Sequence, residues 1–458
     1  MFARLARIAA LAALVPLAAC SAAPEEETAS DAGESAFTGT PNEDIGQFFM
    51  IEHFGVVAEG YADVHDMIKK KNLGAVILWN PTQASGEVAG QMVARYAQSA
   101  SASHHPELFV AADQEERGTQ RFKSRNGFTD LASGDTLGKV IARTGDAKVC
   151  ELHARITSRE MAAAGLNMSL GTVSDVYTKD SGTPGIFRTR AISSDADLVT
   201  SCIRAMTKAY GEEGHVVFVT KHFPGLGNAS GNTDVDPSVK TYSDTKPEMD
   251  AELSPYRAAT AAVNRDGTWP LFGAMISHAS YPILDGSKAP ATLSSVILED
   301  LLRSEPSSAV HGKDKTGADA AFPGMALKGL TVSDAFWTWG AMKNLGPTEK
   351  RRMMARSFLA GMDVLMIAKA DFNGAWDYFQ SLLAGQLPEA EQAALTQAAG
   401  EVDFGTLQRK FKARVAQSAE RVKAAKAAVG PSASFRKTGA PRAASEDLVG
   451  EYQRLIGQ

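Results

Sequence analysis

Short apolar runs alternate with longer amphipathic stretches along most of this chain. The runs are rich in β-branched and aromatic residues, and this pattern predicts strands that are buried on both faces. Eight such runs occur, at 48–51, 75–79, 108–112, 167–171, 216–220, 272–276, 330–332 and 363–367. Helical periodicity fills the intervals between them, at 86–100, 136–164, 194–211, 249–264, 293–303 and 350–360.

Alternating strands and helices favour a parallel sheet. Eight such units predict the α/β class, as a (β/α)8 TIM-type barrel spanning residues 43–385. A doubly wound open sheet is the alternative. No Gly-x-Gly-x-x-Gly follows the first strand, which argues against a dinucleotide-binding form of that sheet. Residues 305–322 are polar and predict an insertion before the seventh strand.

The N-terminal segment has the pattern of a signal peptide, predicted to span residues 1–19. Arg4 and Arg7 precede an apolar stretch that is too short to cross a bilayer. The stretch ends in Leu-Ala-Ala-Cys, which resembles the bacterial lipobox and predicts lipidation of Cys20. An ordinary secretory signal is the alternative. Because Ser21 rather than Asp follows the cysteine, we expect anchoring at the periplasm-facing outer membrane.

Two further segments flank the predicted barrel. Residues 20–42 are Ala, Ser, Glu, Thr and Pro with few large apolar groups, which predicts a flexible tether. Residues 386–428 predict a helical extension of the barrel. Residues 429–458 predict a flexible tail with a short helix at 446–456.

The composition limits the classes of partner. The 458 residues are 44% apolar and 22% charged, with a formal net charge of −6. A mildly acidic chain argues against nucleic acid as a partner, and we expect membrane contact only through the lipid anchor. No metal-ligand spacing is visible, so no metal and no cofactor are expected. Cys150 and Cys202 fall in predicted helices, and the sequence leaves open whether they pair.

Polar and ionisable residues follow four of the predicted strands. Asp113-Gln114-Glu115 ends the third, Lys221-His222 the fifth, Ser277-His278 the sixth and Ser333-Asp334 the seventh. The C-terminal ends of barrel strands face one mouth, so these groups should converge on one site. Paired carboxylates and cations suit the binding of sugar hydroxyls. Asp334 suits a nucleophilic carboxylate, although a helix N-cap is the other common use of an Asp in this position.

The fifth strand opens into an unusual loop. Pro224 and Gly225 allow a tight turn directly after Lys221-His222. A polar stretch rich in Asn, Gly and Asp follows, with Asp234 and Asp236 two residues apart.

These motifs resemble those of the glycoside hydrolase family 3 β-N-acetylglucosaminidases of bacterial cell-wall recycling. The family sequence K-H-F-P-G is intact at 221–225, and D-Q-E is intact at 113–115. Further similarities occur at Ile45-Gly46-Gln47, at 275–282 and at Val332-Ser333-Asp334. Together the matches cover roughly residues 45–370, which is nearly the whole predicted barrel.

The resemblance implies roles for individual residues. Asp334 would be the nucleophile of a retaining exo-β-N-acetylglucosaminidase that acts on peptidoglycan-derived sugars, in a protein expected to be a monomer. The sugar would be bound by Asp113, Arg121, Arg190, Lys221, His222 and His278.

Two departures from the family pattern leave alternatives open. Ser238 stands where the family has its acid/base His. A Ser hydroxyl cannot protonate a leaving group near neutral pH, so Asp236 or Asp234 would have to supply the proton. If neither does, the chain is a weakened or inactive barrel that binds glycan. A third hypothesis is a different pyranoside specificity, because Glu116-Arg117 replaces two family glycines.

Overall fold

The computed structural model describes residues 44–80, 84–115, 118–177, 190–430 and 440–457. The predicted signal peptide, the tether and Cys20 lie outside these ranges, as do Glu116 and Arg117. The described residues belong to one compact unit, 36–458.

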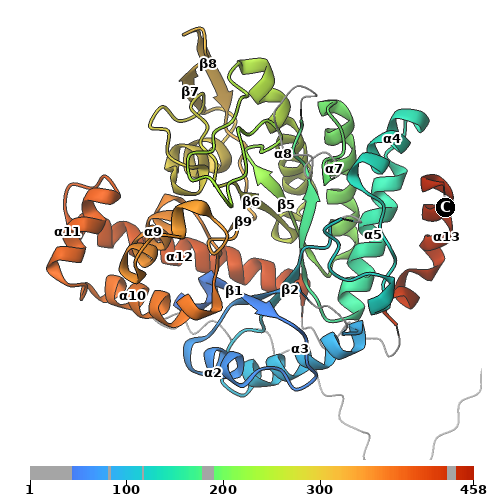
Figure 1. Ribbon diagram of the computed structural model, residues 1–458, viewed down its shortest axis with the longest axis horizontal. Coiled ribbons are helices and arrows are strands. Elements are labelled where there is room, and N and C mark those ends of the chain that lie inside the picture. Colours follow the sequence, from blue (N-terminus) through green and yellow to red (C-terminus); the bar gives the residue numbers. More distant parts are fainter. Residues whose placement is uncertain (1–43, 81–83, 116–117, 178–189, 431–439, 458) are drawn as a thin grey trace, which may run out of the picture. The chain divides into compact units, whose positions relative to one another are not determined.

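Eight parallel strands form the central sheet, in the order β10-β1-β2-β3-β4-β5-β6-β9 (Figure 1). All eight predicted strands are confirmed, with ends that shift by a few residues. Apolar side chains are buried on both faces of the strands, as the near-continuous apolar runs require. The strands are β1 (Phe49–Phe54), β2 (Ala75–Asn80), β3 (Phe109–Ala112), β4 (Met168–Val173), β5 (Val217–Phe223), β6 (Phe272–Ile276), β9 (Leu330–Ser333) and β10 (Leu365–Ile367).

The sheet curls into a nearly closed barrel. Its two ends meet at the parallel bridge between Val332 of β9 and Val364, just before β10. The Ser333 N–H donates to the Val364 carbonyl at 2.9 Å across this junction. The predicted TIM-type barrel is therefore confirmed, and the open doubly wound sheet is excluded.

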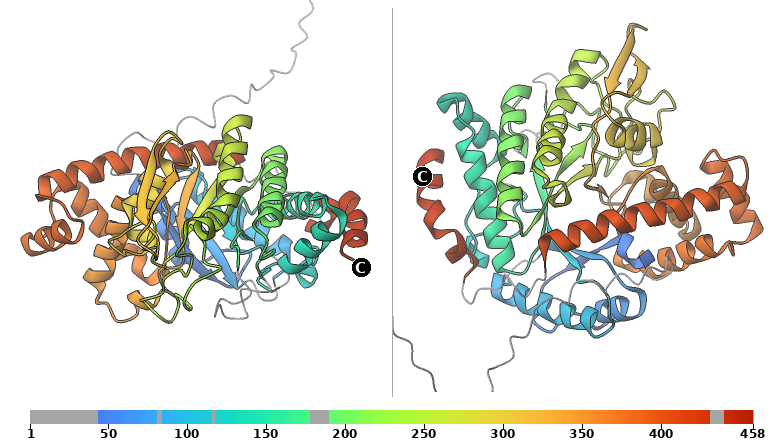
Figure 2. Two further views of the ribbon diagram at one scale, coloured as in Figure 1. Left: turned by 90° about the horizontal axis from the view of Figure 1, so that it is seen from above. Right: turned by 180° about the vertical axis from the view of Figure 1, so that it is seen from behind.

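Helices surround the barrel (Figures 1 and 2). The pattern at 136–164, predicted as one helix, forms two, because Gly145 adopts a left-handed conformation with φ 70° and ends the first of them. Within the described residues, the helices that follow the strands are α2 (Ala62–Lys71), α3 (Gly86–Ser101), α4 (Gly134–Thr144), α5 (Lys148–Ala163), α7 (Ala196–Glu213), α8 (Lys246–Asp266), the π-helical η5 (Val296–Arg303), α9 (Pro347–Ala360) and α10 (Phe372–Ala384).

The polar insertion before the seventh barrel strand forms an antiparallel hairpin of β7 (Ala309–Lys313) and β8 (Asp319–Pro323). The hairpin packs closely on the loop that follows β6. A Cβ added at Gly312 would lie 1.8 Å from the Ile283 carbonyl oxygen, so only glycine permits this approach.

A disulfide joins two of the outer helices. Cys150 in α5 and Cys202 in α7 are bonded, with their Cα atoms 5.4 Å apart. This observation decides the question that the sequence left open.

Beyond α10, the described residues form three α-helices, which are α11 (Glu389–Ala398), α12 (Phe404–Val429) and α13 (Glu446–Ile456). The long helix α12 crosses the back of the barrel in Figure 2. Lys426 donates to Gln47 Oε1 at 2.5 Å and to the Gly74 carbonyl at 3.1 Å, and both partners precede strands. Thus α12 covers the N-terminal ends of the strands and leaves the opposite mouth to the polar residues. None of the described helices is long and apolar enough to span a bilayer.

A buried ion cluster anchors α12 to the barrel. Asp363, just before β10, is fully buried and contacts Arg303 at 2.5 Å, Arg421 at 3.2 Å and Arg414 at 3.4 Å. Burial alone would raise the pKa of Asp363. The three guanidinium groups outweigh this effect and hold its pKa well below the usual range.

We predict that Asp363→Asn lowers the free energy of unfolding by about 3–5 kcal/mol at pH 7, because three arginines packed around a buried carboxylate lose their counter-charge. Since the folded-state pKa is depressed, the stabilisation is present above the unfolded-state pKa and disappears as pH falls through the folded-state pKa. The difference from wild type should therefore shrink below about pH 4. Urea unfolding at pH 7 and at pH 3 measures both effects.

The matched control is Asp377→Asn. Asp377 pairs with Lys71 at the surface, where its side chain is 64% exposed, and this change should cost at most about 1 kcal/mol. A loss at Asp363 no larger than the loss at Asp377 would contradict the prediction.

Candidate active site

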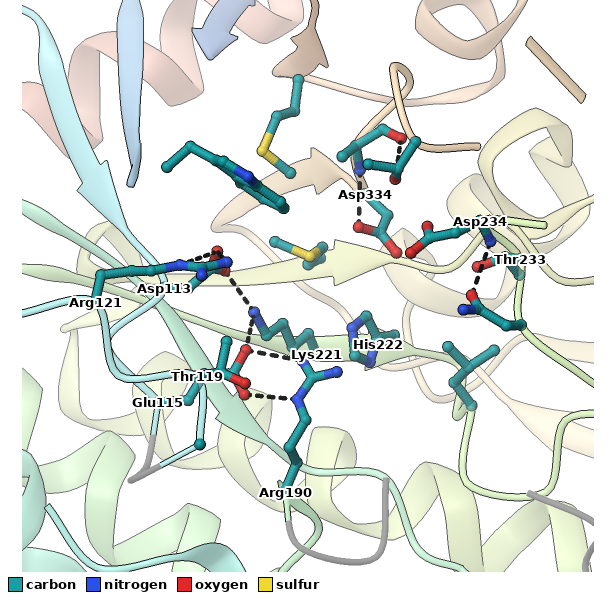
Figure 3. A pocket seen from close by; sticks show the side chains of 18 residues that line it. Asp113, Glu115, Thr119, Arg121, Arg190, Lys221, His222, Thr233, Asp234 and Asp334 are labelled. Atoms are coloured by element: carbon teal, nitrogen blue, oxygen red, sulfur yellow. Dashed lines mark hydrogen bonds and ion pairs between the residues drawn. The ribbon is translucent and has the colours of Figure 1, made fainter. Parts of the chain in front are cut away.

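Polar side chains from the ends of the barrel strands line one pocket at the mouth (Figure 3). Its volume is about 300 Å³. The pocket contains most of the predicted site residues. Its lining includes the ends of β2, β3, β5, β6, β9 and β10 and loops that follow them. Its lining residues are Trp79, Asp113, Glu115, Gly118, Thr119, Arg121, Arg190, Lys221, His222, Leu226, Asn232, Thr233, Asp234, Met275, Asp334, Ala335, Thr338 and Met366.

A buried network of charges forms one side of this pocket. Lys221 Nζ donates to Asp113 Oδ1 at 2.8 Å and to Glu115 Oε1 at 2.5 Å. Arg190 holds Glu115 through two bonds, from Nε at 2.9 Å and from Nη2 at 2.8 Å. Such fixed donors and acceptors can bind the hydroxyls of a sugar without rearranging.

The same network keeps its members charged. Burial alone would raise the pKa of Glu115, but Arg190 and Lys221 outweigh it and lower that pKa below its usual range. Burial alone would lower the pKa of Lys221, but Asp113 and Glu115 raise it. The role of Glu115 was not predicted from the sequence, although its place at the end of the third strand was a signal for it.

Two tryptophan rings, those of Trp79 and Trp337, lie beside these charges. The Arg121 guanidinium lies 4.6 Å from the centre of the Trp79 ring, and its Nη2 is 3.0 Å from Asp113 Oδ2. Trp79 meets Trp337 edge to face, with ring centres 5.4 Å apart. Cation–π and aromatic contacts hold these groups in place. Trp79 was also missed, although it is the last residue of the predicted second strand.

Asp175 orients His222. Its Oδ2 lies 2.8 Å from His222 Nδ1, and its Oδ1 accepts the backbone N–H groups of His222 at 2.9 Å and of Leu226 at 2.8 Å. Three bonds to one buried carboxylate fix the ring and the start of the loop that follows β5. The imidazole is therefore held in one orientation at the pocket.

Asp334 follows β9 and points into the pocket (Figure 3). Its Oδ1 accepts the Ala335 N–H at 2.8 Å. Burial alone would raise the pKa of Asp334, but His222, His278 and the Ala335 N–H outweigh burial and lower it below the usual value. An ionised carboxylate on a rigid strand end has the properties of a nucleophile.

His278, predicted to bind the sugar, is not among the residues that line the pocket. It is buried and stacks on Trp339, with ring centres 4.3 Å apart, while its Nδ1 lies 3.0 Å from Thr292 Oγ1. Burial lowers the pKa of His278 to about 4, so the ring is neutral at pH 7. His278 also lies 5.3 Å from Phe336 between ring centres, so it packs against the segment that carries Asp334.

The two candidate acid/base residues occupy different environments. Asp234 lines the pocket, and its carboxylate points toward that of Asp334 (Figure 3). Burial and the negative charge of Asp334 raise the pKa of Asp234 above its usual value. Asp236 is exposed and accepts from the Ser238 hydroxyl at 2.6 Å, which lowers its pKa. The structure therefore places Asp234 in the pocket, while Asp236 and Ser238 lie outside its lining.

The profile described as "Glycosyl hydrolase family 3 N terminal domain" matches residues 40–401 of this sequence. The chain belongs to glycosyl hydrolase family 3. A β-hexosaminidase of Nitrosomonas eutropha is 31% identical over 240 residues, which is 51% of this chain and 62% of that protein. The β-hexosaminidase LpqI of Mycobacterium tuberculosis is 28% identical over 287 residues, 61% of this chain and 64% of that protein. The chain thus spans less than two thirds of the length of these curated relatives.

Solved structures of other family 3 proteins share the fold. A family 3 glycosyl hydrolase of Mycobacterium smegmatis superposes with a TM-score of 0.62 at 24% identity, covering 86% of this chain and 98% of that one. A family 3 β-N-acetylglucosaminidase of Paenibacillus sp. has a TM-score of 0.60 at 23% identity, covering 82% of this chain and 63% of that one.

The last helix of this family 3 chain is connected to the pocket through two buried side chains. The Tyr452 hydroxyl in α13 accepts the Ala132 N–H at 2.9 Å and lies 3.1 Å from His153 Nδ1. His153 Nε2 lies 2.9 Å from the Glu115 carbonyl oxygen. The segment that ends in Glu115 therefore depends partly on a helix more than 300 residues away in sequence.

We predict that Tyr452→Phe lowers the free energy of unfolding by about 1–3 kcal/mol, since a buried N–H and a ring nitrogen lose their partner. Because His153 contacts the Glu115 backbone, KM should rise more than kcat falls. Chemical unfolding and steady-state kinetics test the two effects. Tyr242→Phe, at a tyrosine that is 50% exposed, is the control. The prediction would be wrong if Tyr452→Phe and Tyr242→Phe had the same free energy of unfolding and the same KM.

Proposed function

We propose that this protein is a retaining glycoside hydrolase in which Asp334 is the nucleophile and Asp234 the acid/base. One observation carries the proposal: two carboxylates share one pocket, and their surroundings lower the pKa of Asp334 and raise that of Asp234. A carboxylate and a protonated carboxyl on the two sides of a glycosidic bond are the groups that retaining hydrolysis requires.

The proposed reaction has two displacement steps. In the first, an Asp334 oxygen bonds to the anomeric carbon while the bond to the leaving oxygen breaks, and Asp234 gives that oxygen its proton. In the second, Asp234 takes a proton from water, whose oxygen displaces Asp334 from the anomeric carbon. The sugar is released with its original anomeric configuration, and both side chains return to their starting states.

The remaining pocket residues would hold the sugar during these steps. Asp113, Lys221 and Arg190 provide charged partners for hydroxyl groups at fixed positions. A cavity of about 300 Å³ is small for a ligand site, which supports binding of one terminal sugar and hence exo action.

We propose a β-N-acetylglucosaminide from peptidoglycan fragments as the substrate. Two relatives described as β-hexosaminidases and a structural neighbour described as a β-N-acetylglucosaminidase support this sugar class. The exposed position of Ser238 favours a second candidate, a glycan-binding barrel with little turnover, because the residue at the family's acid/base position does not reach the pocket.

A time course of product release from an aryl β-N-acetylglucosaminide, with the aryl β-glucoside as the matched control, tests the proposal. Steady release from the first substrate alone supports the proposed activity. A burst of about one equivalent followed by a stall would indicate a working nucleophile without a base. No release from either substrate would exclude hydrolysis of both sugars, and titration with chitobiose would then test the binding function.

We also propose that Cys20 carries a lipid anchor and that the protein acts as a monomer at the outer membrane, facing the periplasm. The Leu-Ala-Ala-Cys order supports this location. Cys20→Ser should move the protein from the membrane fraction to the soluble fraction, and an unchanged distribution would disprove the anchor.

A further inference from the structure

The loop that carries Asp234 has a narrow stem. We call residues 228–243 the Asp234 loop. At its stem the Tyr242 N–H donates to the Asn228 carbonyl at 2.7 Å, and the Ser230 N–H donates to the Lys240 carbonyl at 2.8 Å. The two sides of the stem therefore pair before the loop extends toward the pocket. The stem is one of the contacts that place Asp234, together with the Thr233 carbonyl, which accepts the Gly340 N–H at 2.9 Å.

One carboxyl oxygen joins both ends of this stem. Glu252, in the second turn of α8, is 1% exposed. Its Oε1 accepts from Asn228 Nδ2 at 2.9 Å and from Ser243 Oγ at 2.8 Å. Asn228 Nδ2 also donates to Ser243 Oγ at 3.1 Å, which closes a buried triangle. Glu252 thus ties the first and last residues of the Asp234 loop to the helix.

The turn after β5 is shaped around the same side chain. A Cβ added at Gly225 would lie 1.8 Å from Glu252 Oε2, and Gly225 has φ 149°. Only glycine allows this close approach and this backbone conformation. The glycine of the Lys-His-Phe-Pro-Gly motif is therefore required for Glu252 to reach the stem.

Glu252 favours its uncharged form at neutral pH. Burial and the nearby Asp175 carboxylate raise its pKa to about 8. The other ionisable groups that face it are Tyr256 on α8 and Tyr281 after β6, both buried. Within the described residues its Oε2 has no hydrogen-bond partner. A neutral carboxyl can lie beside Asp175 without repelling the charge that orients His222.

We propose that Glu252 is a positioning residue, which closes the stem of the Asp234 loop and so places the Asp234 carboxyl against the leaving-group oxygen. This inference rests on the proposed function, in which Asp234 donates the proton. Glu252 contacts no substrate in this scheme and acts on the loop through Asn228 and Ser243.

Leaving-group dependence separates positioning of the acid from general damage. A 2,4-dinitrophenyl glycoside departs with little acid help, whereas an alkyl glycoside needs a proton. Glu252→Ala should lower kcat/KM about 10²-fold for the alkyl glycoside and only a few-fold for the dinitrophenyl glycoside, because kcat/KM reports the first displacement. Glu252→Gln should stay near wild type for both substrates, since its amide oxygen can accept the same two bonds.

Glu160→Ala is the matched control. Glu160 is also a buried carboxyl with a raised pKa, and it accepts from Thr129 and Ser445 away from the pocket. Glu160→Ala should change kcat/KM by the same factor for the alkyl and the dinitrophenyl glycoside. If Glu252→Ala does not fold, Ser243→Ala removes one of the two bonds and should show the same leaving-group dependence to a smaller extent.

A pH series of unfolding provides an independent readout. Because the pKa of Glu252 is higher in the folded than in the unfolded state, wild type loses stability relative to Glu252→Gln as pH rises from about 4.5 to about 8. The unfolding midpoint of Glu252→Gln should therefore rise relative to wild type across that window. If the difference in unfolding midpoint between Glu252→Gln and wild type stays constant across that window, Glu252 is ionised in the folded state. That result would overturn its assignment as a neutral side chain at the loop stem.

The outcomes for Asp234→Asn distinguish the two proposals. Suppose that the loss of kcat/KM in Asp234→Asn depends strongly on the leaving group, whereas the losses in Glu252→Ala and Ser243→Ala do not. The positioning role of Glu252 is then wrong, while the proposed function stands. If Asp234→Asn affects both substrates equally, Asp234 is not the proton donor, and the positioning role falls with it.

Discussion

Replacing Asp334 by Asn should lower kcat/KM for an aryl β-N-acetylglucosaminide by about 10⁴-fold or more, which corresponds to about 5 kcal/mol of lost transition-state stabilisation. The reason is chemical, because a neutral amide cannot form the bond to the anomeric carbon that the ionised Asp334 carboxylate forms in the proposed first step. Its depressed pKa keeps wild-type Asp334 in the reactive form over a wide pH range.

Initial rates and intact protein mass test this prediction together. Wild type stopped early in the reaction should gain the mass of one sugar, and Asp334→Asn should not. The amide has nearly the same shape as the carboxylate, so the variant should remain folded, which thermal unfolding verifies. A folded variant that retains more than about one tenth of wild-type activity would show that Asp334 is not the nucleophile.

Replacing Asp234 by Asn should lower kcat/KM by about 10²–10⁴-fold for substrates with a poor leaving group, and much less for an activated aryl glycoside. With the activated substrate a burst of about one equivalent should appear, because the second step still lacks a base. Added azide should restore turnover and yield a glycosyl azide, since this anion needs no base to attack the anomeric carbon.

The pH profile provides a second measure of the same pair. Activity needs Asp334 ionised and Asp234 protonated, so kcat/KM should have an acidic limb below the ordinary carboxyl range and an alkaline limb above it. The apparent pKa values obtained from the two limbs belong to the Asp334–Asp234 pair and not to either residue alone. In Asp234→Asn the alkaline limb should disappear for the alkyl glycoside, whose departure needs the proton of Asp234.

Asp236→Asn is the matched control for Asp234→Asn. Asp236 lies two residues away on the same loop but is exposed and bonded to Ser238. Its replacement should leave kcat/KM within about twofold of wild type for every leaving group, because surface changes away from a site have small effects. A large loss in Asp236→Asn with little change in Asp234→Asn would reverse the assignment.

The apolar pattern was sufficient to predict the barrel because its strands are buried on both faces. Each strand had to be a continuous apolar run, and such runs are visible without any knowledge of their partners. The helix boundaries were less predictable. Gly145 divides 136–164 into α4 and α5, although the apolar periodicity continues across it.

The predicted site residues lie close together in the structure for a related reason. Parallel strands in a barrel must end at one mouth, so Asp113, Lys221, His222 and Asp334 were brought together by topology alone. His278 also follows a strand, but its side chain stacks on Trp339 and does not line the pocket. Which side of the strand end a residue occupies depends on local backbone geometry that no pattern of polarity reveals.

The sequence by itself determined the α/β barrel, the family motifs and the mouth at which the chemistry is placed, because these depend on local periodicity and on the order of elements. Only the tertiary structure decided three further points. These are that Cys150 pairs with Cys202, that Asp234 rather than Asp236 enters the pocket, and that Glu252 bonds to both ends of the Asp234 loop. Each depends on contacts between distant segments and on burial, and it is burial together with neighbouring charge that shifts the pKa values on which the proposed chemistry rests.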